Sequence, residues 1–294
     1  MEEKPPDKKT KKIREREVIV SDVIRETPDS ATLVLSSDEG TPEYKAGQFL
    51  TIDPHQFPVL DRWCRYLEVE KGKKEPPRAY SLSSAPHEEH VSFTVKESLY
   101  YPGDTPYPPL ISPLLTYEIP VGAKMIIKGF TGSYVIDEKI ENSSDHVLHI
   151  CAGSGIVPNF SIIKDELING STRKHTLIYT NKTWDDIIFR DEFFDLEKEY
   201  PGRIKVLHAI TREENEMLLN KGIRIGRPDI EFVKNAIEDV SSTSVFICGP
   251  AVSSFEKKEA KKSGVEPKPM FLETMIAYLN EIGIPSERIK KESW

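Results

Sequence analysis

The run Pro76-Pro77-Arg78-Ala79-Tyr80-Ser81-Leu82-Ser83-Ser84 is the part of the sequence around which the fold is organised. Its two prolines disfavour a helix and its small hydroxyl residues close it, so the sequence predicts a short strand over residues 79–82. Alternation along a strand places Arg78 and Tyr80 on one face and Ala79 and Ser81 on the other. A guanidinium suits a phosphate and a phenol ring suits a planar heterocycle, so we interpret this run as a ligand-binding strand.

The sequence on both sides of this strand has the pattern of a small all-β unit. Short β-rich runs are separated by clusters of Pro, Gly, Asp and Ser, and we expect strands at residues 18–20, 32–35, 49–52, 63–67, 91–95 and 124–127. This spacing predicts an N-terminal antiparallel β-barrel domain over residues 17–141. Residues 1–16 are almost all charged or proline, which predicts a disordered tail.

The pattern changes after the polar stretch 141–145, which we interpret as a linker. Strands are expected at residues 146–151, 176–179, 204–208 and 244–248, and helices at 159–167, 184–199, 228–240 and 271–282. A final strand should follow the last helix, from Ile289 onward. Strands that alternate with helices predict a C-terminal α/β domain over residues 146–294, with a doubly wound parallel sheet.

The composition excludes several classes of protein. The net charge of −8 argues against a nucleic-acid partner, and no apolar run is long enough to predict a membrane span. The seven histidines show no metal-ligand spacing, so no metal site is expected. The three cysteines are odd in number and far apart, which predicts a reducing, cytoplasmic location. They are also too few to ligate a plant-type iron–sulfur cluster.

Three further motifs follow the Arg78–Ser81 run in order along the chain. They are Thr94-Val95-Lys96, Gly153-Ser154-Gly155-Ile156-Val157-Pro158 and Cys248-Gly249-Pro250. Together these motifs resemble the ferredoxin–NADP reductase superfamily, particularly the flavin reductase module of bacterial oxygenase systems, over residues 17–294. The resemblance implies that the barrel binds FAD, with FMN as the alternative, and that the α/β domain binds NADPH, with NADH as the alternative.

For the flavin, the resemblance assigns a role to each motif residue. Arg78 would bind a flavin phosphate, and Tyr80 would lie against the flavin. Ser81 would hydrogen-bond near flavin N5, and Ala79 belongs to the same cofactor-binding strand. Thr94, Val95 and Lys96 would line the rest of the cofactor. Ser112 is a good N-cap before Pro113, so a short helix should begin there, and the backbone of Leu110, Ile111 and Ser112 would face a pyrophosphate.

For the nicotinamide coenzyme, glycines let the backbone approach a pyrophosphate at the turn formed by Gly153, Ser154, Gly155 and Ile156. The resemblance places Cys248 beside the nicotinamide, with Gly249 and Pro250 forming a close turn. The adenosine ribose should lie at Thr180, Asn181 and Lys182, with Arg190 one helix length further on. Cations suit a 2′-phosphate, so this turn favours NADPH.

The chain ends in Glu292-Ser293-Trp294, an acidic residue two places before an aromatic one. This ending resembles plant-type ferredoxin–NADP reductases, in which the aromatic stacks on the flavin. By that resemblance Trp294 would cover the flavin face, and Glu292 would relay a proton to or from the reduced flavin.

The expected reaction is hydride transfer from nicotinamide to flavin, catalysed with Ser81, Cys248 and Glu292, followed by one-electron steps. Because the sequence ends at Trp294 without cluster cysteines, the expected acceptor is a separate iron–sulfur protein, an oxygenase component or a flavodoxin. Two alternatives remain: a reductase of small acceptors such as ferric complexes or free flavin, and a non-catalytic regulatory or electron-transfer subunit. The second gains support from Pro109, where the family usually has glycine.

Overall fold

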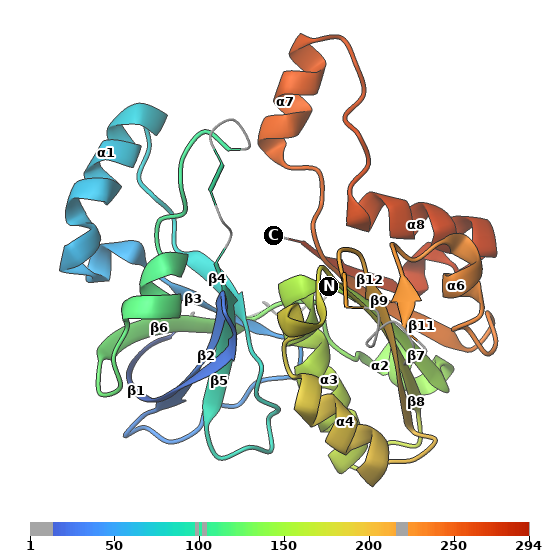
Figure 1. The fold of residues 1–294 in the computed structure, drawn as a ribbon. Coiled ribbons are helices and arrows are strands. Elements are labelled where there is room, and N and C mark those ends of the chain that lie inside the picture. The colour runs from blue at the N-terminus through green and yellow to red at the C-terminus, as the bar shows by residue number, and fades with distance from the viewer. Residues whose placement is uncertain (1–13, 98–99, 102–104, 216–222, 294) are drawn as a thin grey trace, which may run out of the picture.

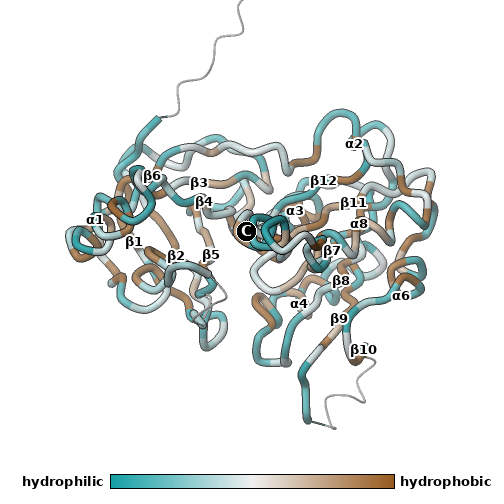
Figure 2. The backbone as a smooth tube through the Cα atoms, turned by 90° about the horizontal axis from the view of Figure 1, so that it is seen from above, coloured by the Kyte–Doolittle hydropathy of each residue, from teal (hydrophilic) through white to brown (hydrophobic). Residues whose placement is uncertain are grey.

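The computed structural model describes residues 14–97, 100–101, 105–215 and 223–293. An antiparallel barrel and a parallel sheet with helices on both faces lie side by side (Figure 1). Apolar segments run through the inside of each half (Figure 2). The predicted combination of a β-barrel and a doubly wound parallel sheet is therefore confirmed.

The barrel has six antiparallel strands in the order β4-β3-β6-β1-β2-β5. They are β1 (Glu15–Thr27), β2 (Ser30–Ser36), β3 (Phe49–Ile52), β4 (Arg78–Ser81), β5 (Val91–Lys96) and β6 (Lys124–Thr131). A bridge between Leu82, directly after β4, and Phe93 within β5 closes the barrel. Strand β1 includes residues 15–16, which were expected in the tail, and residues 1–13 lie outside the described part.

The second domain has six parallel strands in the order β10-β9-β8-β7-β11-β12. They are β7 (His146–Ala152), β8 (Lys174–Asn181), β9 (Ile204–Ile210), β10 (Arg224–Ile225), β11 (Thr243–Cys248) and β12 (Ile289–Glu292). Leu148 and Ile150 of β7 pack toward α6 (Ile230–Lys234) and α8 (Phe271–Ile282). Cys151 packs on the opposite face, toward α3 (Ile156–Ile168) and α4 (Arg190–Glu199). The final strand after the last helix is confirmed.

The strand expected at residues 63–67 is wrong, because this segment forms helix α1 (Asp61–Lys71). Cys64 and Leu67 lie one helical turn apart and are the buried residues of the helix. The helix ends at Gly72, whose φ of 64° is a left-handed conformation that favours glycine. The β-rich composition of this stretch was misleading because its apolar spacing is helical.

Several other boundaries differ from the expectation. The linker 141–145 lies partly in α2 (Glu138–Ser143), which Asp137 caps by accepting from Ile140 N. The helix expected at 184–199 is split, because Phe189 has a φ of 59° and interrupts it before α4. Only residues 230–234 of the helix expected at 228–240 are α-helical. Short 3-10 helices cover Pro54–Gln56, Pro58–Leu60, Gly153–Gly155, Trp184–Asp186 and Ser286–Arg288, and a π-helix covers Leu114–Glu118.

An additional helix, α7 (Ser254–Lys262), projects away from both domains (Figure 1). Ser253 and Glu256 form a capping box at its start, so local hydrogen bonds stabilise a helix that buries only Ala260. Its lysines Lys257, Lys258, Lys261 and Lys262 are exposed.

The two domains are joined by direct contacts between side chains and backbone. Ser161 Oγ on α3 donates to the Ser84 carbonyl at 2.6 Å, and Lys290 Nζ lies 2.6 Å from Asp137 Oδ2. Gly47 has a φ of 88°, and a Cβ there would lie 2.0 Å from the Tyr134 carbonyl oxygen. The backbones are therefore packed too closely at this point for any other residue.

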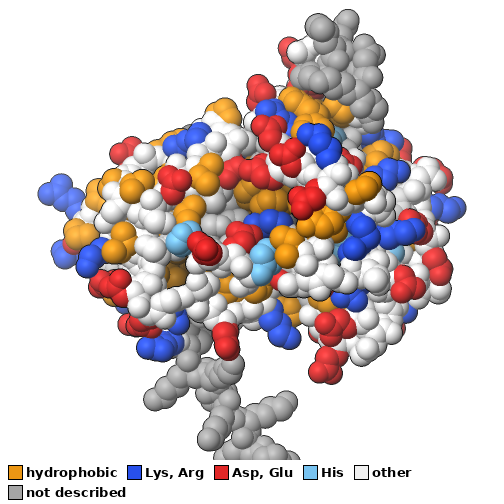
Figure 3. Space-filling model, turned by 90° about the horizontal axis from the view of Figure 1, so that it is seen from below, with side chains coloured by type: hydrophobic (Ala, Val, Ile, Leu, Met, Phe, Trp, Pro, Cys, Tyr) orange, Lys and Arg blue, Asp and Glu red, His pale blue; other side chains and the backbone are white. Residues whose placement is uncertain are grey.

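The molecular surface has mixed charge. Lys and Arg side chains lie among Asp and Glu side chains across the face seen from below (Figure 3). Among the described residues, no helix combines the length and the apolar character needed to cross a membrane.

Candidate active site

A cavity of about 950 Å³ lies between the two domains. One wall comes from barrel strands β4 and β5, and the other comes from the carboxyl ends of the parallel strands together with α8. The carboxyl ends of parallel strands are the usual binding edge of a doubly wound sheet. Most of the predicted site residues line this cavity, namely Ala79, Tyr80, Ser81, Thr94, Val95, Lys96, Gly153, Ser154, Thr180, Asn181, Lys182, Cys248, Pro250 and Glu292.

The barrel wall is formed by the strand that the sequence singled out. The Tyr80 ring packs against Phe93 with 5.4 Å between centroids, and burial raises the pKa of Tyr80. Lys96 Nζ lies 2.6 Å from Asp29 Oδ1, so this cation is already neutralised within the barrel. Thr94 Oγ1 is hydrogen-bonded to Thr32 Oγ1 at 2.7 Å, and Val95 belongs to the barrel core. These residues form a wall whose one lysine is paired with an aspartate.

The glycine turn occupies the opposite wall, at the end of β7. Gly153 has a φ of 52°, and Gly153 and Ser154 both line the cavity. Gly155 and Ile156 are buried behind the turn and do not line it. Asn159 on α3 donates from Nδ2 to the Gly155 carbonyl at 2.8 Å, which ties the turn to the helix. The sequence analysis missed Asn159, because its contact depends on how the helix follows the turn.

Cys248 and Glu292 lie at the ends of neighbouring strands. The two residues are paired in register between β11 and β12, and both line the cavity. Burial, reinforced by the charge of Glu292, raises the pKa of the Cys248 thiol, so the thiol stays protonated. Burial also raises the pKa of Glu292, and its interaction with Ser81 opposes the shift. The three residues expected to be catalytic are therefore brought together; Trp294 lies outside the described residues.

Gly249 follows Cys248 at a point of close contact. A Cβ at this position would lie 2.5 Å from Cδ1 of Phe271 and 3.3 Å from the Ala152 Cβ. The absence of a side chain lets the Phe271 ring, which lines the cavity, approach the end of β11. This contact explains why glycine stands at position 249, while the role of Gly249 and Pro250 at the nicotinamide stays a prediction.

Three cations border the end of the cavity where β8, β9 and β10 terminate. They are Lys182, Arg212 and Arg227, and within the described ranges none of them is ion-paired with a carboxylate. The Arg212 N–H donates to the Lys182 carbonyl at 2.7 Å, which holds the two turns together. The sequence analysis missed Arg212 and Arg227. Their position directly after strands β9 and β10 is the signal that marks them.

Arg190, by contrast, does not line the cavity. Its guanidinium lies 3.8 Å from Asp185 and 3.3 Å from Asp191, and it covers the Trp184 ring at 5.8 Å. The structure therefore places Arg190 beside these carboxylates, just after the helical break at Phe189, and not at the ribose turn.

Four residues predicted for the flavin phosphates are not among those that line the cavity. Leu110 and Ile111 are buried, in separate apolar clusters of the barrel. The expected short helix is present, because residues 112–113 are helical and lead into the π-helix Leu114–Glu118, but Ser112 makes no side-chain cap. Arg78 forms an ion pair with Glu75 at 2.5 Å.

Comparison with known proteins gives one family match and many similar chains. Residues 149–256 match the oxidoreductase NAD-binding domain family. Flavohemoprotein A of Dictyostelium discoideum is 26% identical over 94% of this chain and 59% of its own length. The ferredoxin reductase component of 3-ketosteroid-9-alpha-monooxygenase from Mycobacterium tuberculosis is 28% identical over 80% of this chain and 58% of its own length. The chain thus spans somewhat more than half of these relatives.

Two solved structures have the same architecture. One is the FAD/NAD-binding domain of nitric oxide dioxygenase from Vibrio cholerae, with a TM-score of 0.68, 19% identity, and coverage of 95% of this chain and 98% of the other. The other is a ferredoxin NADP+ reductase from Neisseria gonorrhoeae with bound FAD and NADP, with a TM-score of 0.63, 21% identity, and coverage of 96% and 98%. The chain therefore has the same two-domain fold as these two structures, and its residues 149–256 match the oxidoreductase NAD-binding domain family.

Proposed function

We propose that this protein is an NAD(P)H-dependent flavoprotein reductase that passes electrons to a separate one-electron acceptor. The observation that carries the proposal is the single cavity shared by the two domains. It brings Ser81 of the barrel to Cys248 and Glu292 of the parallel sheet. A flavin bound on the barrel wall and a nicotinamide coenzyme bound on the wall of the parallel sheet would meet at this junction. Positioning of this kind is the main contribution of a protein to cofactor chemistry.

Buried polar atoms at the cavity fit bound cofactors. Within the described part of the chain, both amide atoms of Asn181, Oγ1 of Thr180 and Oε2 of Glu292 are buried without a hydrogen-bond partner. An unpaired buried polar group is costly, so such atoms at the edge of a cavity favour a polar ligand. Asn181 and Thr180 would face the coenzyme ribose, while Ala79, Tyr80 and Ser81 would face the flavin.

When bound, a flavin supplies the conversion of a two-electron hydride donor into one-electron steps. The residues of this chain contribute position and proton control. Ser81 offers a hydroxyl at the junction, and burial raises the pKa of the Glu292 carboxyl group, which favours its protonated form. The neutral thiol of Cys248 and the Phe271 ring keep the nicotinamide end uncharged and exclude water.

For the coenzyme, we infer NADPH. Lys182, Arg212 and Arg227 border the end of the cavity beyond Asn181 and offer three positive charges to a 2′-phosphate. NADH would leave these charges without a partner.

For the acceptor, curated relatives include ferredoxin reductase components, flavohemoproteins and NADH-cytochrome b5 reductases. We favour a separate iron–sulfur protein or oxygenase component. Reduction of small acceptors such as ferric complexes is the second candidate, because the cavity is also compatible with a free-standing reductase.

The purified protein is expected to be yellow, and anaerobic addition of NADPH should bleach the flavin absorption. Subsequent mixing with an oxidised iron–sulfur protein should restore the absorption faster than mixing with a ferric chelate. Folded protein that stays colourless after incubation with FAD and with FMN would contradict the flavoprotein proposal. Faster oxidation by the chelate would favour the second candidate.

Gly249→Val is expected to raise the KM for the coenzyme about five- to tenfold while leaving flavin affinity unchanged. The added side chain would push against Phe271, whose ring lies within 2.5 Å of the new Cβ. Steady-state kinetics and flavin titration check this result. Gly264→Val is a matched control, because no atom lies within 4 Å of a Cβ there, although its φ of 67° adds some strain. Equal effects of both substitutions on KM would contradict the role of the close contact.

A further inference from the structure

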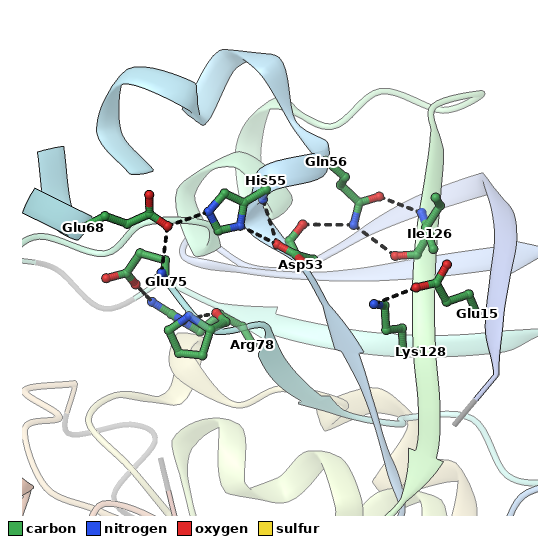
Figure 4. A network of polar contacts seen from close by, with 10 residues as sticks. Glu15, Asp53, His55, Gln56, Glu68, Glu75, Arg78, Ile126 and Lys128 are labelled. Atoms are coloured by element: carbon green, nitrogen blue, oxygen red, sulfur yellow. Dashed lines mark hydrogen bonds and ion pairs between the residues drawn. The ribbon is translucent and has the colours of Figure 1, made fainter. Parts of the chain in front are cut away.

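Glu75 is a buried carboxylate held between two cations outside the cavity. It is 2% exposed. Its Oε1 accepts from Lys71 Nζ at 2.6 Å. Its Oε2 accepts from Arg78 Nη2 at 2.5 Å (Figure 4). Burial opposes ionisation, but the hydrogen bonds from Lys71 and Arg78 outweigh it and lower the pKa of Glu75. The carboxylate is therefore charged, and both of its oxygens are occupied.

A second set of contacts, made through Glu68 on α1, holds the backbone of Glu75 in place. Glu68 Oε1 accepts from the Glu75 N–H at 3.0 Å and lies 2.9 Å from His55 Nε2. His55 Nδ1 lies 2.6 Å from Asp53 Oδ1, directly after β3 (Figure 4). This chain of contacts ties α1 and the following loop to the barrel. Glu75 thus has little freedom to follow a movement of Arg78.

The contacts define the plane of the Arg78 guanidinium. One terminal nitrogen donates to Glu75 and the other donates to the Pro76 carbonyl. A guanidinium is planar and has five N–H donors, so two fixed directions set its orientation and leave donors for another ligand. The Arg78 side chain remains 32% exposed.

A carboxylate at this position has two opposite effects on anion binding. It reduces the local positive charge, which weakens the attraction of a phosphate. It also holds the guanidinium in one orientation, which lowers the entropy lost when a phosphate binds. The sign of the net effect therefore shows which of the two roles Glu75 has.

We propose that Glu75 is a positioning residue that holds Arg78 in the orientation in which it binds a flavin phosphate, with α1 as the support of this arrangement. This inference rests on the proposed flavoprotein function. Sequence analysis identified Arg78 but gave no role to Glu75.

The test is a pair of titrations of full-length flavin-free protein with FAD and with riboflavin, which lacks the phosphate. Glu75→Gln is expected to weaken FAD binding about tenfold, although the substitution makes the phosphate site more positive. Riboflavin affinity should not change. Glu70→Gln on the exposed side of α1 removes the same charge without contacting Arg78, and it should leave both affinities unchanged.

A double-mutant cycle shows whether Glu75 acts through Arg78. Arg78→Ala should weaken FAD binding tenfold or more, because a charge-assisted contact is lost. In that background Glu75→Gln should have no further effect. Should Glu75→Gln fail to fold, Glu75→Asp keeps the charge but shortens the side chain, and it should also weaken FAD binding selectively.

Tighter FAD binding by Glu75→Gln would show that the carboxylate only screens Arg78 and would overturn the proposal. Unchanged FAD binding, or equal losses for FAD and riboflavin, would overturn it as well. An additive effect in the Arg78→Ala background would exclude action through Arg78. Wild-type protein that binds neither ligand would instead refute the flavoprotein function itself, and the inference with it.

Discussion

Lys182→Glu is expected to raise the KM for NADPH by about ten- to a hundredfold and to change the KM for NADH much less. A hydrogen bond to a charged group contributes about 1.5–3 kcal/mol, and reversal of the charge adds repulsion of a 2′-phosphate. A carboxylate accepts hydrogen bonds from a 2′-hydroxyl, which limits the loss with NADH. Steady-state kinetics with both coenzymes measure the change in preference.

The structure provides both supporting and control substitutions for this prediction. Arg212→Glu and Arg227→Glu should act in the same direction, because both side chains border the same end of the cavity. Arg190→Glu makes the same change of charge but removes a guanidinium that faces Asp185 and Asp191, so it should leave the preference unchanged. An equal loss for NADPH and NADH in Lys182→Glu would show that the side chain does not reach the 2′ position. A wild-type preference for NADH would refute the NADPH proposal directly.

Glu292→Gln is expected to lower turnover about a hundredfold with little change in coenzyme KM. The carboxyl group lies at the junction of the two walls beside Ser81 and Cys248, where a proton must enter or leave. General acid–base groups of this kind contribute about 10²–10⁴-fold to rates. An amide keeps the shape of the side chain and cannot exchange the proton at that position.

The pH dependence of this variant has a defined sign. Burial raises the pKa of Glu292. At pH values between the unfolded and the folded pKa, the folded protein therefore keeps a proton that the unfolded chain releases. The contribution to stability is complete below the unfolded pKa and is lost as the pH rises through the folded pKa. Turnover that needs the protonated carboxyl should fall over the same range in the wild type, and Glu292→Gln should remove both dependences.

Thermal unfolding between pH 4 and 8 measures the stability effect. This range extends upward from the ordinary carboxyl pKa of about 4.3, because the pKa of Glu292 is raised. Glu292→Gln should lose the part of the stability that changes with pH in this range, because an amide does not titrate. Glu281→Gln, at an exposed position on α8, is the control. Full activity of Glu292→Gln, with an unchanged pH profile, would contradict the proton-transfer role.

The sequence by itself determined the two-domain architecture and most of the cavity wall. The barrel strands and the alternating strands and helices are local patterns of apolar residues and turn residues, and such patterns depend on neighbours in the chain. The glycines at positions 153 and 249 could also be singled out from the sequence, but the contact between Gly249 and Phe271 depends on the folded structure. The same local reasoning failed at residues 63–67, where a β-rich composition lies on a helical spacing.

Only the tertiary structure decided which charged groups act together. The sequence suggested Arg190 as a coenzyme cation, but in the folded chain its guanidinium lies beside Asp185 and Asp191. Arg212 and Arg227 become part of the site because β9 and β10 end at the same edge of the sheet as β8. The orientation of Arg78 depends on Glu75, whose own position depends on Glu68 and, through it, on His55. Electrostatic interactions act over distances in space rather than along the chain, so sequence patterns alone do not reveal them.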